Sequence, residues 1–91
     1  MKILFIGTVE FSLKALEKLI NINANIVGIC TKNKSSFNSD FANLIPVCKN
    51  NNIPYKYVDN INSTENIKWI RDLLPDIIFC TYSYNISINI Y

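Results

Sequence analysis

The residue types that carry most acid–base catalysis are sparse in this 91-residue sequence. The chain contains no histidine, which excludes an imidazole general base and any imidazole metal ligand from within it. Its scattered carboxylates include Glu10, Asp40, Asp59 and Asp76. Their spacing predicts no pair that could divide the acid and base roles. We therefore interpret each one first as a helix cap or a surface charge.

Sequence patterns for phosphate and metal binding are also missing. Gly7 is the only glycine near the first predicted turn, so there is neither a GxGxxG dinucleotide cradle nor the GK[ST] of a P-loop. The cysteines Cys30, Cys48 and Cys80 are odd in number and far apart, without CxxC spacing. We expect neither a disulfide framework nor a zinc site, and we expect these thiols to be small buried hydrophobes.

Binding residues must then be sought in loops that follow strands. The apolar strand at residues 2–6 stops at Gly7 and turns at once into an amphipathic helix over 11–20. In an α/β domain, ligands gather at the carboxyl ends of strands, near helix N-termini. A polar loop at 31–40 follows the second strand in the same way. Its members Lys34, Ser35 and Asn38 could meet a nucleotide phosphate or sugar, and the alternative is a solvated loop.

Four strands and three helical stretches position these loops. Strands are predicted at 2–6, 26–30, 55–58 and 76–80, with helical stretches between them at 11–20, 40–52 (regular from about Pro46) and from about 64 to 74. Right-handed crossovers give an α/β, Rossmann-like, three-layer parallel sheet of strand order 3-2-1-4, incomplete at the fourth-strand edge. Residues 7–11 and 81–84 would then flank one crevice. We expect one domain over 1–80 and a divergent tail over 81–91.

The bulk composition indicates a globular chain without an electrostatic partner. Apolar residues make up 49% of the sequence and charged residues 18%, with a formal net charge of +2 and no basic run. This gives no strong nucleic-acid signal. No apolar run is long enough to span a bilayer, and no signal peptide pattern precedes the first strand, so the expected location is the cytoplasm.

Several of these motifs together resemble a known family. Residues 1–11, MKILFIGTVEF, closely resemble the N-terminal signature of the formyltransferases that use 10-formyltetrahydrofolate. That family includes methionyl-tRNA formyltransferase and the amino-sugar N-formyltransferases of surface-polysaccharide (lipopolysaccharide) biosynthesis. The segments NIPY at 52–55 and LPDIIF at 74–79 match the family's approaches to its third and fourth strands. The resemblance covers about residues 1–80.

The resemblance implies two groups of site residues. Thr8, Glu10 and Phe11 would border the substrate crevice; the alternative roles are an N-cap, a charge matching the helix dipole and a core aromatic. By the same resemblance, Phe79, Thr81 and Tyr82 would border the folate. Their alternative is a buried strand end followed by a frayed aromatic tail.

Two departures from the family pattern bear on which molecule accepts the formyl group. Val9 stands where the tRNA-modifying members usually have proline, and the loop over 34–41 is shorter than theirs. We therefore expect the complete enzyme to transfer a formyl group from 10-formyltetrahydrofolate to a nucleotide-linked amino sugar. The alternatives are a methionyl-tRNA formyltransferase-like fragment and a non-catalytic nucleotide-binding or association module.

A third departure concerns catalysis. The resemblance implies an Asn, a His and an Asp beyond the fourth strand, associated with an HxSLLP-type segment, and the chain has no counterpart of them. The sequence drifts from the family pattern after Cys80. We therefore expect an apparently truncated chain that is inactive alone and has no catalytic residue of its own. The uncovered fourth-strand edge predicts self-association.

Overall fold

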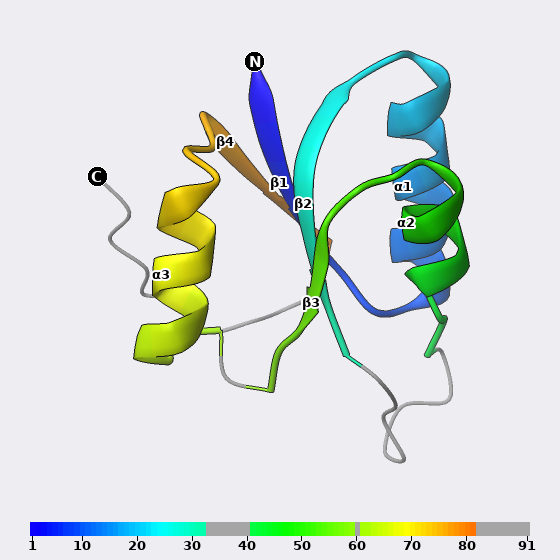
Figure 1. The fold of residues 1–91 in the computed structure, drawn as a ribbon. Coiled ribbons are helices and arrows are strands. Elements are labelled where there is room, and N and C mark those ends of the chain that lie inside the picture. The colour runs from blue at the N-terminus through cyan, green and yellow to red at the C-terminus, as the bar shows by residue number, and fades with distance from the viewer. Residues whose placement is uncertain (33–40, 60, 82–91) are drawn as a thin grey trace.

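The computed structural model describes residues 1–32, 41–59 and 61–81, which form the predicted parallel α/β sheet (Figure 1). The sheet has the predicted strand order β3-β2-β1-β4. Three of the binding residues predicted from the sequence, Lys34, Ser35 and Asn38, and also Tyr82, lie outside the described residues. In chain order the elements are β1 (Lys2–Ile6), α1 (Glu10–Asn21), β2 (Asn25–Thr31), α2 (Ile45–Asn50), β3 (Tyr55–Tyr57), α3 (Thr64–Asp72) and β4 (Ile77–Cys80).

The central strand β1 is buried on both faces because helices cover both sides of the sheet. α1 and α2 lie on one side and α3 lies on the other (Figure 1). Phe5 packs in the core cluster under α1 and α2, and Leu4 and Ile6 pack in the cluster on the α3 side. Successive side chains of β1 thus enter the cores on opposite faces of the sheet, which explains why β1 is apolar at every buried position, as expected for a central parallel strand.

The start of α1 differs from the predicted cap. Thr8 was expected as the N-cap, but the helix begins at Glu10 and the N-cap is Val9, which has no side-chain acceptor. The hydroxyl of Ser12, one turn into the helix, accepts hydrogen bonds from the N–H groups of Thr8 (3.2 Å) and Val9 (3.3 Å). A serine inside the helix thus satisfies amide groups that a cap residue normally serves.

Each of the three helices is followed by a residue with a positive φ. Asn23 follows α1 and Asn52 follows α2, both with positive φ (61° and 55°). The next amide in each case donates to the carbonyl five residues earlier, as in a Schellman motif. α3 ends at Asp72, and Leu74, two residues further on and just before Pro75, also has a positive φ (52°). Leu74 is outside the right-handed helical region, as expected for a residue that precedes a proline.

The remaining helix starts agree with the sequence. Pro46 lies in the first turn of α2, where a missing N–H costs nothing. Ser63 caps α3 by accepting from the N–H of Asn66 at 3.3 Å. Within the part of the chain that the structure describes, no helix is long and apolar enough to cross a membrane.

Candidate functional site

Three segments meet at the carboxyl ends of β1 and β4. Gly7 ends β1, Ser12 lies in the first turn of α1, and Thr81 follows β4. A Cβ atom placed on Gly7 would lie 2.5 Å from both Ser12 Cβ and Thr81 Oγ1. Only glycine therefore lets the helix and the fourth strand approach β1 this closely. We call this meeting of Gly7, Ser12 and Thr81 the switch-point junction.

Hydrogen bonds hold the junction together. The Thr81 hydroxyl lies 2.7 Å from Ser12 Oγ and donates to it, and it lies 3.2 Å from the Ile6 carbonyl oxygen. The Thr81 N–H donates to the same carbonyl at 3.0 Å. Because Ser12 Oγ also binds the amides that precede α1, one hydroxyl connects the entry to the helix with the end of β4.

The three residues predicted to border the substrate lie in different environments. Thr8 is 1% exposed, and its hydroxyl has no hydrogen-bond partner among the described residues. Glu10 is exposed in the first turn of α1, where a negative charge suits the helix dipole. Phe11 is 69% exposed, so the alternative of a core aromatic is wrong. The reason is its position on α1, because the buried stripe runs through Ser12 and Leu16.

Two of the predicted folate-bordering residues lie beside each other at the end of β4. Phe79 stacks on Phe5 with ring centroids 5.6 Å apart and planes 9° apart, yet 38% of it is exposed. The alternative of a wholly buried strand end therefore does not hold for Phe79. Thr81 belongs to the switch-point junction, and Phe11 precedes the serine that Thr81 binds. The predicted donor side and substrate side of the crevice thus meet through Ser12 and Thr81.

Ser12 was missed by the sequence analysis. Its type and position fitted an ordinary polar residue of an amphipathic helix, and yet it is fully buried. One signal in the sequence could have identified it. Val9 has no side-chain acceptor that could cap a helix, and Ser12 lies three residues later, at the position from which a side chain can bind the amide of the N-cap residue.

The described residues contain no cluster of three or more His, Cys, Asp or Glu side chains that could hold a metal ion. Cys30 and Cys48 are buried as expected, and burial raises the pKa of the Cys30 thiol to about 12 and that of Cys48 to about 11. Cys80 is exposed, so the expectation that it is buried is wrong. Its position on an edge strand explains the difference.

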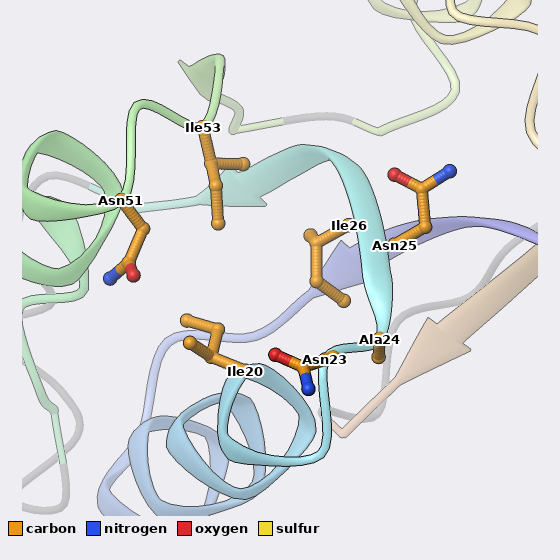
Figure 2. Close-up of a pocket in the computed structure, with 7 residues that line it drawn as sticks. All are labelled: Ile20, Asn23, Ala24, Asn25, Ile26, Asn51 and Ile53. Atoms are coloured by element: carbon orange, nitrogen blue, oxygen red, sulfur yellow. The ribbon is translucent and has the colours of Figure 1, made fainter.

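A pocket of about 360 Å³ lies at the opposite end of the sheet (Figure 2). Its apolar floor includes Ile20, Ile26 and Ile53, and side-chain amides such as those of Asn23 and Asn51 lie around it (Figure 2). The two asparagines belong to the ends of α1 and α2, so helix termination accounts for them. This pocket lies at the amino ends of the strands, away from the switch-point junction.

The sheet order defines a Rossmann-like α/β fold, and the junction lies at the carboxyl ends of β1 and β4, the end of the sheet at which folds of this class bind their ligands. No family model matches the chain. The chain is similar over 82 residues to methionyl-tRNA formyltransferases, with 32% identity to those of Thermotoga sp. (strain RQ2) and Thermotoga maritima and 35% to that of Alkaliphilus oremlandii. The match takes in 86% of the chain and 26% of each relative.

The predicted resemblance to the N-terminal region of the formyltransferase family is therefore confirmed. The chain spans about a quarter of the length of these relatives. They are methionyl-tRNA formyltransferases and not amino-sugar formyltransferases, so they favour the alternative of a methionyl-tRNA formyltransferase-like fragment.

Proposed function

We propose that this chain forms the N-terminal part of a formyltransferase of the methionyl-tRNA type, in which the switch-point junction shapes the binding site for 10-formyltetrahydrofolate. The observation that carries the proposal is the similarity over 82 residues combined with the close packing of Gly7 against Ser12 and Thr81. Ligands of doubly wound sheets bind outside the carboxyl ends of the strands at this point.

The side chains at the junction suit a folate. Phe79 presents part of an aromatic face, and heteroaromatic rings stack on such faces. Thr81 supplies a hydroxyl that can exchange its protein partners for a ligand, since it already bridges Ser12 and the Ile6 carbonyl. Exposed Phe11 and Glu10 lie on the other side of the junction, where the acceptor would approach.

The chain supplies binding surface, and the chemistry comes from elsewhere in the enzyme. Formyl transfer needs a base for the attacking amine and donors for the oxyanion that forms on the formyl carbon. The chain has no histidine, and the junction consists of Gly7, Ser12 and Thr81, none of which carries a carboxylate. We therefore expect no formyl transfer by the 91-residue chain alone. The cytoplasmic location expected from the sequence stays a prediction.

The relatives favour methionyl-tRNA over a nucleotide-linked amino sugar as the acceptor. Methionyl-tRNA is the acceptor in the names of the similar proteins, whereas no similar protein found acts by name on an amino sugar. Val9 and the short loop over 34–41, which favoured the sugar, are single local features. We therefore take methionyl-tRNA as the acceptor of the complete enzyme.

A chimera tests this proposal. Residues 1–81 of this chain would replace the matching region of the Thermotoga maritima relative, and transfer of a formyl group from 10-formyltetrahydrofolate to methionyl-tRNA would be measured. We expect an active chimera in which Thr81→Val raises the KM for the folate. Thr31→Val is the matched control, because its buried hydroxyl has no partner in the described structure and lies outside the junction. A folded chimera without transfer activity would overturn the proposal.

A further inference from the structure

Three hydrogen-bond donors meet on one oxygen at the switch-point junction. Ser12 Oγ accepts from the Thr81 hydroxyl at 2.7 Å and from the N–H groups of Thr8 and Val9 at 3.2 and 3.3 Å. The side chain of Ser12 is fully buried, so bulk water does not reach this oxygen. The three donors must therefore share what Ser12 Oγ offers.

A serine hydroxyl oxygen offers two lone pairs, which is one fewer than the donors that it meets here. The bond from Thr81 has the ordinary O–H···O length of about 2.7–2.8 Å, whereas both amide bonds are longer than the usual N–H···O length of about 2.9–3.0 Å. Close packing against Gly7, where no Cβ atom fits, keeps Ser12 and Thr81 together. The two amides are consequently held weakly while Thr81 donates to Ser12.

These donors come from two sides of the junction. Thr81 follows β4 and is one of the residues proposed to border the folate. Thr8 and Val9 precede α1, whose first turn carries Glu10 and Phe11 on the side proposed for the acceptor. Val9 is the N-cap and has no side-chain acceptor of its own, so the entry to the helix depends on the oxygen that Thr81 also uses.

We propose that Ser12 is a positioning residue that couples the folate side of the junction to the acceptor side, an inference that rests on the proposed function. When a folate takes over the Thr81 hydroxyl, Ser12 Oγ loses its closest donor. Its lone pairs then serve the amides of Thr8 and Val9 alone, and both of these bonds shorten. The start of α1 is thereby fixed in the position from which Glu10 and Phe11 meet the acceptor.

The consequence is that the two ligands bind more tightly together than separately. A helix start that is already ordered has less conformational freedom to lose when the acceptor binds. Such coupling is reciprocal, so the acceptor raises the affinity for the folate by the same factor. Couplings between sites are typically about 5- to 150-fold, and we expect about fivefold because only two hydrogen bonds change.

Hydrogen exchange on the 91-residue chain tests the competition for Ser12 without any ligand. Thr81→Val imitates the folate-bound state, because valine has the shape of threonine but no hydroxyl to donate. The amides of Thr8 and Val9 should exchange more slowly in Thr81→Val than in the wild type. Thr31→Val is the matched control, since it removes a buried hydroxyl outside the junction and should leave both amides unchanged. Equal exchange in the wild type and Thr81→Val, or equal slowing in Thr31→Val, would overturn the proposal.

The chimera of residues 1–81 with the Thermotoga maritima relative tests the coupling itself. The dissociation constant of 5-formyltetrahydrofolate, a stable folate, would be measured with and without saturating methionyl-tRNA. We expect about fivefold tighter folate binding with methionyl-tRNA in the wild-type chimera and no difference in Ser12→Ala. Ser63→Ala is the matched control, because it removes a serine that caps α3, away from the junction, and should keep the coupling.

The outcomes separate this inference from the proposed function. A wild-type chimera whose folate affinity does not respond to methionyl-tRNA, or a Ser12→Ala chimera that keeps the full response, would overturn the role of Ser12 alone. A folded wild-type chimera that binds no folate would overturn the proposed function and this inference together.

Discussion

Gly7→Ala tests whether close packing at the switch-point junction requires glycine. The new Cβ would lie 2.5 Å from Ser12 Cβ, whereas carbon atoms in contact prefer about 3.5–4.0 Å. Ser12 Cβ is attached directly to the backbone of α1, so the start of the helix must move by about 1 Å to make room. Overpacking of this kind costs about 1–3 kcal/mol.

The same movement weakens hydrogen bonds that are already long. The Thr8 and Val9 amides lie 3.2 and 3.3 Å from Ser12 Oγ, and each such bond contributes about 0.5–1.5 kcal/mol. The lower chain entropy of alanine in the unfolded state returns about 0.4–1 kcal/mol. We therefore expect Gly7→Ala to lower the free energy of unfolding by about 2–3 kcal/mol.

Urea denaturation measures this loss, and Gly28→Ala is the control. A Cβ on Gly28 would also meet an atom at 2.5 Å, but that atom is Leu73 Cδ1, the end of a side chain that can change rotamer. We expect Gly28→Ala to lose no more than about 1 kcal/mol. An unchanged midpoint for Gly7→Ala, or a larger loss for Gly28→Ala, would refute the argument that the helix backbone makes the junction rigid.

Two further predictions concern the termination of α3 and the buried thiols. Leu74 has a φ of 52° and is 68% exposed, so Leu74→Gly should raise the free energy of unfolding by about 0.5–1 kcal/mol, and a lower urea midpoint would contradict this. The raised pKa values of Cys30 (about 12) and Cys48 (about 11) mean that the unfolded chain releases these protons near pH 9 while the folded chain retains them. The contribution of these thiols to stability should therefore be constant below about pH 8 and fall as the pH rises from 9 toward 11. Cys30→Ala should fall less steeply over this range, and identical slopes in urea denaturation would show that the thiol does not contribute.

The strand order was predictable because local sequence signals mark where each strand and helix begins and ends. The apolar run that ends at Gly7, the serine Ser63 before α3 and Pro75 after it each have one dominant physical interpretation, as a strand end, a helix cap and a helix stop. Parallel strands and right-handed crossovers then leave few arrangements of four strands. The sheet order followed from these rules without any knowledge of side-chain contacts.

The site was less predictable because its residues act through distant partners. Thr8 has the right type for an N-cap, but Ser12 takes that role, and the choice depends on space beside Gly7 that Thr81 also fills. Phe11 was as apolar as a core residue, and only the orientation of α1 on the sheet leaves it exposed. Local sequence patterns carry little information about such contacts between residues up to 75 positions apart.

The most direct test of the central claim locates folate binding on the 91-residue chain. The ¹⁵N-labelled protein would be titrated with 5-formyltetrahydrofolate, a stable folate, and amide shifts would be followed by NMR. The account predicts shifts at Gly7, Thr8 and Thr81, around the switch-point junction. Shifts confined to the pocket of Figure 2, at Asn23, Ala24 and Ile53, or no shifts at saturating folate, would contradict it.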